Sequence, residues 1–177
     1  MRSPTRQRGV SLIEVLVAVM IFTIGLLGLA GLLIMATRSN QAAYLRTQVV
    51  FLAHNMADRM SANPVAVWDG SYNSDSYPTA TSVTTNCDLT TSCTPDDLAA
   101  HDMQTWSTQL NTFLPNATAT IKCDGGSAGF SPSSAEYGMR PPYGGNCKMT
   151  ISWAERGTGD SSNITATQTK FTWNFQP

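Results

Sequence analysis

The sequence predicts an α+β fold, in which one long N-terminal helix packs on a small antiparallel sheet. Two observations predict this arrangement. A long apolar run from about residue 12 passes after residue 38 into an apolar stripe with helical spacing, which lasts to the Asn63-Pro64 pair. Three segments of the last third instead alternate apolar and polar residues. The length of 177 residues suits one ordinary domain.

The composition is poor in charge. Hydrophobic residues make up 42% and charged residues 13%, against an average of roughly 25% charged residues in soluble domains. The formal net charge is -1, and after Met60 five Lys and Arg face ten Asp and Glu. This balance argues against a nucleic-acid binder, which needs a basic surface. The apolar content argues against a disordered chain.

The N-terminus combines a basic start with a long apolar run. Arg2, Arg6 and Arg8 precede Gly9 without an acid, and residues 15–36 carry no charge. A run of this length indicates a membrane-spanning helix, because a cleaved secretory signal has a shorter core that ends at a small-residue site. The arginines predict a cytoplasmic N-terminus by the positive-inside rule.

Glu14 is a lone carboxylate at the edge of the apolar run. Ser11 and Glu14 fit the S-x-x-E capping box, with Ser11 as N-cap. A carboxylate also suits the positive end of the helix dipole. Because charge is expensive in an apolar segment, a functional role stays open beside the cap.

The helix becomes amphipathic after residue 38. One apolar stripe follows a helical spacing: Leu45, Val49, Leu52, Met56 and Met60. Asn63-Pro64 ends the helix. The rod is roughly 75 Å long at 1.5 Å per residue, so half can span a membrane and half can pack on a head.

The head begins with a segment that has no period. Residues 65–95 read as a loop rich in Gly, Ser, Thr, Asn and Pro. Thr94 and Pro95 then predict the start of a short helix, which Pro115 ends. Its buried stripe is expected to be Ala99, Met103, Trp106, Leu110 and Phe113.

The last third reads as strands over residues 118–122, 148–154 and 165–175, separated by turns rich in Gly and Ser. The side chains expected to face inward are Ala119, Ile121, Cys123, Met149, Ile151, Trp153, Phe171, Trp173 and Phe175.

The four cysteines, Cys87, Cys93, Cys123 and Cys147, all lie in the head, on the exported and oxidising side. Of the three possible pairings we favour Cys87–Cys93 with Cys123–Cys147, because each bond closes a loop that contains no helix. A zinc site is the weaker alternative, since no C-x2-C pair exists and no histidine lies close in sequence.

No motif for catalysis is recognised. The sequence lacks the nucleophile elbow, the zinc-protease helix, the phosphate-binding loop and the dinucleotide fingerprint. Asp96 and Asp97 are explained as acids at a helix start, and with Asp102 they have no EF-hand spacing. We therefore expect a non-enzyme without metal or cofactor.

Residues 8–16, Arg-Gly-Val-Ser-Leu-Ile-Glu-Val-Leu, followed by the apolar helix, resemble the type IV prepilin signal. The resemblance implies that prepilin peptidase cuts between Gly9 and Val10 and methylates Val10, where Phe is more usual. It also implies that Glu14 pairs with the new amine of a neighbouring subunit and sets the assembly register. Such pairing is favoured because an unpaired buried charge costs several kcal/mol.

Three further segments resemble the PilV family of type IV pilus minor pilins: residues 24–32, 57–64 and 93–106. The resemblance implies the pilin fold and four regions. These are a leader at 1–9, a transmembrane and assembly helix at 10–37, the amphipathic half of the spine at 38–64, and a periplasmic head at 65–177.

The implied function is to initiate pilus assembly near the tip and so to support twitching motility and adhesion. The implied partners are other minor pilins, the major pilin and the inner-membrane assembly machinery. The protein is then expected in the bacterial inner membrane and afterwards outside the cell in the pilus.

Gly25, Gly28 and Gly31 allow two interpretations within this resemblance. Each costs roughly 1 kcal/mol relative to Ala in a helix interior. They predict either close packing against partner helices or a point where the helix unwinds on extraction into a filament.

Two other functions stay open. A type II secretion pseudopilin shares the signal and the spine, although the segments at 57–64 and 93–106 favour the minor pilin. A surface-binding module at the pilus tip is the second, through an aromatic loop of Trp68, Tyr72 and Tyr77.

Overall fold

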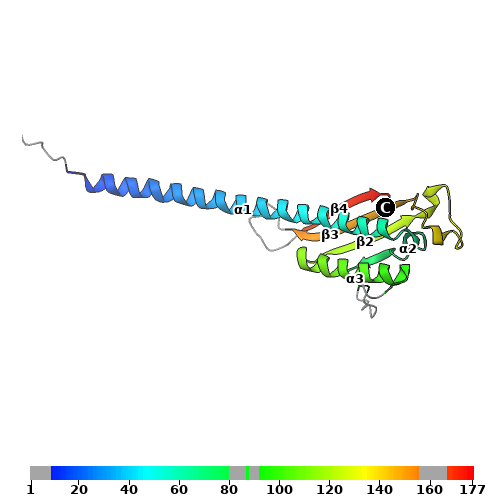
Figure 1. Ribbon diagram of the computed structural model, residues 1–177. Helices are drawn as coiled ribbons and strands as arrows, with labels where there is room; N and C mark the ends of the chain where they lie inside the picture. The colour runs from blue at the N-terminus through cyan, green and yellow to red at the C-terminus, as the bar shows by residue number, and fades with distance from the viewer. Residues whose placement is uncertain (1–8, 80–86, 88–91, 156–166) are drawn as a thin grey trace, which may run out of the picture.

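A computed structural model describes residues 9–79, 87, 92–155 and 167–177. One long helix extends alone over its first half and lies along the head over its second half (Figure 1). This helix, α1 (Leu12–Ala62), is continuous over 51 residues, which confirms the predicted span.

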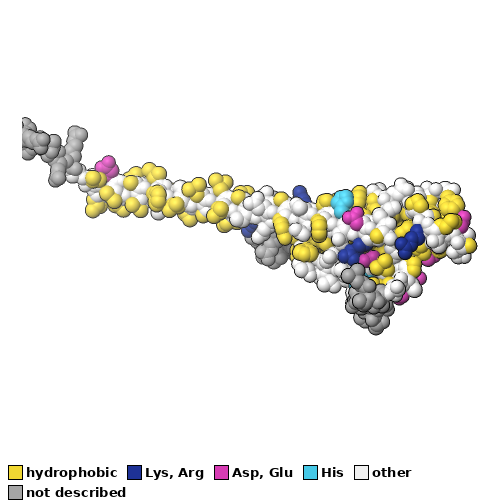
Figure 2. Space-filling model, in the orientation of Figure 1, with side chains coloured by type: hydrophobic (Ala, Val, Ile, Leu, Met, Phe, Trp, Pro, Cys, Tyr) yellow, Lys and Arg dark blue, Asp and Glu magenta, His cyan; other side chains and the backbone are white. Residues whose placement is uncertain are grey.

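Burial divides α1 into two halves. Of the predicted stripe, Val49, Leu52, Met56 and Met60 are buried, and Leu45 packs partly against them. Before this stripe, every residue from Leu12 to Thr37 is exposed. The space-filling view shows the resulting hydrophobic surface along the free half of the rod (Figure 2). Only the second half of the helix therefore belongs to the core of the head.

The Asn63-Pro64 pair ends α1, as predicted, because a proline inside a helix removes a hydrogen bond and clashes with the preceding turn. Pro64 opens a second helix, α2 (Pro64–Trp68), and β1 (Ser74–Tyr77) follows. The prediction of a loop from residue 65 is wrong for these two elements. They contain five and four residues, which is too short for a periodic signal.

In the described residues the sheet has four strands in the order β1-β2-β3-β4, and every neighbouring pair is antiparallel. The strands β2 (Thr118–Asp124), β3 (Asn146–Glu155) and β4 (Thr167–Phe175) fall on the three predicted segments. Residues 165 and 166 of the third prediction lie outside the described residues. The predicted inward side chains are buried, except that Cys123, Phe171 and Trp173 are half-buried.

Helix α3 (Pro95–Phe113) begins as predicted, with the Thr94 hydroxyl oxygen accepting a hydrogen bond from the Asp97 N–H at 3.2 Å. Four members of its predicted stripe face the core, but Phe113 does not and is exposed. The reason is that the backbone becomes extended at Leu114, which turns the Leu114 side chain inward instead.

The core fills the space between the sheet, α3 and the second half of α1. Trp106 of α3 is fully buried, and its indole Nε1 donates to the Leu52 carbonyl of α1 at 2.9 Å. Two 3-10 turns, η1 (Gly125–Ala128) and η2 (Tyr137–Met139), connect β2 to β3 at the far end of the head. The head is thus held on α1 by apolar packing and by this indole contact.

The aromatic residues of the segment after α1 do not form an exposed loop. Tyr72 and Tyr77 are buried, and the ring of Tyr77 packs edge-on against Trp106 with centroids 5.1 Å apart. Trp68 is half-buried, and its Nε1 donates to the Pro141 carbonyl at 3.1 Å. The turn between α2 and β1 directs both tyrosines inward, so the predicted exposed aromatic loop is wrong for Tyr72 and Tyr77.

Candidate functional site

The Gly9–Val10 junction lies just before α1 in non-helical backbone. Both residues are exposed, and a Cβ placed on Gly9 would meet nothing within 4 Å. Helical structure starts at Leu12. An enzyme can therefore reach the peptide bond between Gly9 and Val10 without unfolding the helix.

Ser11 occupies the N-cap position but does not cap the helix. Its side chain makes no capping hydrogen bond, and the first turn is closed by its carbonyl, which accepts from the N–H of Glu14 at 3.1 Å and of Val15 at 3.3 Å. The predicted capping box is therefore wrong in its hydrogen bonds. The Glu14 carboxylate stays exposed in the first turn, where the helix dipole favours it.

The Glu14 carboxylate borders an apolar groove on the first three turns of α1. The groove is lined by Val10, Glu14, Val15, Ala18, Val19 and Phe22. Glu14 is the single charged residue among them. This places one negative charge at the N-terminal end of a surface that otherwise favours an apolar neighbour.

The free half of α1 is suited to an apolar surrounding. Among the described residues, α1 is the helix long and apolar enough to cross a bilayer. The Thr23 hydroxyl donates to the Met20 carbonyl at 2.8 Å, and the Thr37 hydroxyl donates to the Ile34 carbonyl at 2.9 Å. Both hydroxyl protons are satisfied within the helix, which is what an apolar medium requires.

The three glycines of this half create no break. Gly25, Gly28 and Gly31 are helical, and a Cβ at any of them would meet nothing within 4 Å. The bare backbone is therefore open to a partner helix, and the interpretations of packing and of unwinding both remain predictions.

A polar network joins the spine to the head. The Arg59 guanidinium of α1 donates to Asp102 Oδ1 of α3 at 2.7 Å, and the Tyr72 hydroxyl donates to Asp102 Oδ2 at 2.8 Å. Asn63 donates to the Tyr72 hydroxyl at 3.3 Å and to the Pro95 carbonyl at 2.7 Å. These contacts fix the end of α1 against α3.

Burial sets the protonation of the two tyrosines at this network. Burial, reinforced by the negative Asp102 carboxylate, raises the pKa of Tyr72 above its ordinary value. Burial raises the pKa of Tyr77 as well. Both hydroxyls therefore stay protonated and act as donors, with Tyr77 donating to the Tyr72 carbonyl at 2.8 Å.

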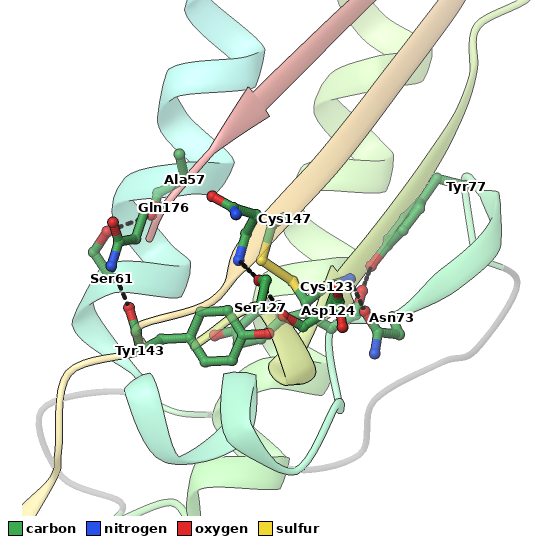
Figure 3. Close-up of a disulfide and its surroundings, with 12 residues drawn as sticks. Ala57, Ser61, Asn73, Tyr77, Cys123, Asp124, Ser127, Tyr143, Cys147 and Gln176 are labelled. Carbon is green, nitrogen blue, oxygen red and sulfur yellow. Dashed lines mark hydrogen bonds between the residues drawn. A yellow bond between two sulfur atoms is a disulfide. The ribbon is translucent and has the colours of Figure 1, made fainter. Parts of the chain in front are cut away.

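Two disulfides brace the head. Cys87 is bonded to Cys93, and Cys123 is bonded to Cys147, which is the pairing that the sequence favoured. Cys123 and Cys147 are direct register partners on β2 and β3, with Cα atoms 3.9 Å apart (Figure 3). No thiol is left to ligate zinc, because all four cysteines are bonded.

Two sequence families match the chain. Residues 4–30 match the prokaryotic N-terminal methylation motif, and residues 31–104 match the family described as type IV pilin Tt1218. Together the two matches, over residues 4–104, support a type IV pilin. Comparisons with curated proteins and with solved structures find no match.

The first match covers the Gly9–Val10 junction and Glu14, so these residues lie within the methylation motif. The second match runs from Gly31 into α3 and ends two residues after Asp102. Strands β2, β3 and β4 lie beyond it. The spine and its attachment to α3 are therefore the shared part, and most of the sheet is outside it.

Sequence reasoning missed the role of Asp102. The residue was grouped with Asp96 and Asp97, but these two serve the loop and the helix start, where Asp96 accepts from Ser71 and Asp97 from Thr94. The sequence did contain a signal for this role. Asp102 directly precedes Met103 of the predicted apolar stripe, which places it on the buried side of α3. A carboxylate at such a position needs a buried partner.

Proposed function

We propose that this pilin is a minor pilin of the PilV kind, which helps to initiate type IV pilus assembly near the tip and so supports twitching motility and adhesion. The observation that carries the proposal is the methylation motif at the start of a 51-residue spine whose first half is bare and apolar. The likeness of residues 57–64 and 93–106 to PilV favours this member of the pilin class.

The chain starts as an inner-membrane protein with a cytoplasmic leader and a periplasmic head. Prepilin peptidase removes residues 1–9 and methylates Val10. The free half of α1 then leaves the bilayer for a bundle of pilin helices, where its apolar side chains stay away from water. The assembly machinery and the other pilins are the partners of this step.

Glu14 sets the register in that bundle. Its carboxylate is not used in a cap and lies beside an apolar groove. A neighbour's Val10 amine supplies the opposite charge, and pairing removes the penalty of leaving the carboxylate alone in an apolar setting.

N-terminal sequencing and mass measurement of the mature protein test the processing step. The expected mature chain begins with N-methylated Val10. A Gly9→Trp variant should keep its leader, because the indole blocks access to the cleaved bond. A mature wild-type chain that starts elsewhere would contradict the proposal.

A clean gene deletion tests the cellular role and decides against the type II secretion pseudopilin. Surface pili, twitching and protein secretion are scored separately in the deleted strain and in a complemented one. We expect loss of pili and twitching with normal secretion. Lost secretion with normal pili would assign the pseudopilin function instead.

A further inference from the structure

Strand β4 is an edge of the sheet. It pairs with β3 on one side and has no strand on the other among the described residues. Figure 1 shows β4 at the margin of the sheet farthest from α3. A strand in this position presents a row of backbone donors and acceptors.

The register shows which residues of β4 face outward. The N–H of Ala154 in β3 donates to the Pro115 carbonyl, which precedes β2, so the backbone of Ala154 points toward β2. Its register partner Gln168 therefore directs its own N–H and C=O away from β3. By alternation, the outward set is Gln168, Lys170, Thr172 and Asn174.

The Cys123–Cys147 pair between β2 and β3 leads to the same set of outward residues in β4. The N–H of Cys123 in β2 donates to Asn73 at 2.7 Å, away from β3, so Cys123 and Cys147 form a non-hydrogen-bonded pair. Cys147 then turns its backbone to β4 and pairs with Phe175. The backbone groups of the outward set have no partner among the described residues.

This edge lacks the usual protection. β4 is nine residues long, against a mean of about 5–6 residues, and its register to β3 is unbroken. It contains no proline and one charged residue, Lys170. Natural edge strands that avoid pairing are short, bulged, charged or interrupted by proline.

The core side of β4 is also incompletely covered. Phe171 and Trp173 are only half-buried, although both face the core side of the sheet. The Trp173 ring stacks on Phe175 at 4.7 Å and contacts His54 of α1 at 4.6 Å between centroids. A further strand beside β4 would place its own core-side side chains next to these rings and reduce their exposure.

The opposite edge is blocked. β1 has four residues, and its register to β2 shifts between Ser74 and Tyr77. The Ser76 N–H is taken by the Ser74 hydroxyl oxygen at 3.1 Å. Pro78, which follows the strand, has no N–H to donate. Within the part of the chain that the structure describes, the sheet therefore has one open edge and one closed edge.

We propose that β4 pairs, in antiparallel fashion, with an edge strand from the head of a different pilin. The antiparallel orientation rests on the proposed function. In a pilus the spines of neighbouring subunits enter one bundle in parallel, so their heads point in the same direction. In such heads the first strand of the sheet runs antiparallel to β4. In a second copy of this chain held in the same direction, the antiparallel edge strand is the blocked β1. Strand pairing between heads therefore cannot continue from one copy of this chain to the next.

The test is site-specific photo-cross-linking of the full-length chain in pilus-assembling cells. A photoreactive residue replaces Asn174 on β4, and a matched control replaces Asp75 on the blocked β1. Cross-linked peptides are sequenced by mass spectrometry from the membrane fraction and from sheared pili. We expect Asn174 adducts to an edge strand of another pilin, and none from the Asp75 position.

Backbone variants show whether pairing causes the adducts. Thr172→Pro removes an outward N–H without touching the ladder to β3, and Thr172→Val keeps it. We expect the adduct to fall about fivefold or more in the proline variant and to persist in the valine variant. Lys170→Pro is the second proline variant, and thiol alkylation checks that both disulfides, and hence the head, remain intact.

The pairing would be overturned if no Asn174 adduct formed, or if the adduct survived both proline changes in folded chains. It would also be overturned if the adduct joined two copies of this chain. So would adducts to a protein that is not a pilin. The amount of the chain in sheared pili is measured in the same samples and reports on the proposed function separately. Entry into pili without the Asn174 adduct rejects the pairing alone, whereas absence from pili rejects the proposed function.

Discussion

The sequence allows two roles for Glu14, a helix cap and an assembly register, and the structure bears on the first. The capping hydrogen bonds are absent, so the charge of Glu14 does little for the start of α1 beyond the helix dipole. We expect Glu14→Gln to leave membrane insertion unchanged and to lower incorporation into sheared pili sharply. Glu14→Asp, which keeps the charge, should retain more of the incorporation. Normal incorporation of the Gln variant would contradict a register role.

Asp102 is the buried acid that joins the end of α1 to α3. Asp102→Ala leaves the half-buried Arg59 guanidinium without its carboxylate and the buried Tyr72 hydroxyl without its acceptor. We expect a loss of about 3 kcal/mol in the free energy of unfolding. Denaturant unfolding of the full chain in detergent, followed by tryptophan fluorescence, measures it.

Asp75→Ala is the matched control for that experiment. It breaks the ion pair with Lys122, whose two side chains are 77% and 67% exposed. Exposed pairs contribute little to stability, so no measurable change is expected. Equal losses in the two variants would show that the Arg59–Asp102 contact has no special role.

The buried tyrosines predict a loss of stability at alkaline pH. Burial raises the pKa values of Tyr72 and Tyr77 in the folded chain. The unfolded chain therefore loses these protons first, from about pH 10 upward. Stability from these groups is complete below that pH and decreases above it. Unfolding curves at stepwise higher pH check the prediction, and Tyr77→Phe should reduce the slope.

At the scale of elements, the two disulfides differ in what they constrain. Cys123–Cys147 joins two adjacent strands over a sequence separation of 24, whereas Cys87–Cys93 spans 6. Loop-closure entropy predicts a cost of about 3.5 kcal/mol for removing the longer bridge and about 2.4 kcal/mol for the shorter.

Paired Cys→Ala variants of each bridge, unfolded in denaturant, measure the two costs. A larger loss from the Cys87–Cys93 pair would show that local structure, and not loop closure, sets the contribution.

At the scale of the whole molecule, the two edges of the sheet and the long connections predict a scarce subunit. A bulk subunit repeats one heterologous contact between copies along the fibre. Among its described residues, this head has one open strand edge and one blocked edge. The connection from Asp124 to Asn146 contains short 3-10 turns in place of strands. Such a head suits contacts with different partners.

Quantitative mass spectrometry of sheared pili tests this. We expect the chain at far lower abundance than the major pilin, close to that of other minor pilins. Abundance near that of the major pilin would reject the idea, as would normal piliation after a clean deletion with no substitute pilin expressed.

The sequence by itself determined the elements with a sustained local period. The stripe from Leu45 to Met60, the Thr94 cap and the alternation of the three long strands were all readable, because side-chain spacing along one helix or strand decides which face is apolar. The prepilin signal was readable for the same reason, since it is contiguous in the chain. The favoured cysteine pairing could also be predicted from the sequence, because each bond closes a short loop that contains no helix.

The tertiary structure alone decided the features that depend on partners distant in sequence. The sequence predicted that Tyr72 and Tyr77 are exposed, but in the structure Tyr77 packs on Trp106 and Tyr72 donates to Asp102. The sequence also grouped Asp102 with two acids at the helix start, whereas the structure pairs it with Arg59. The open edge at β4 and the blocked edge at β1 follow from strand order and register. No local pattern contains this information, because a buried polar group or a free strand edge is defined by what folds against it.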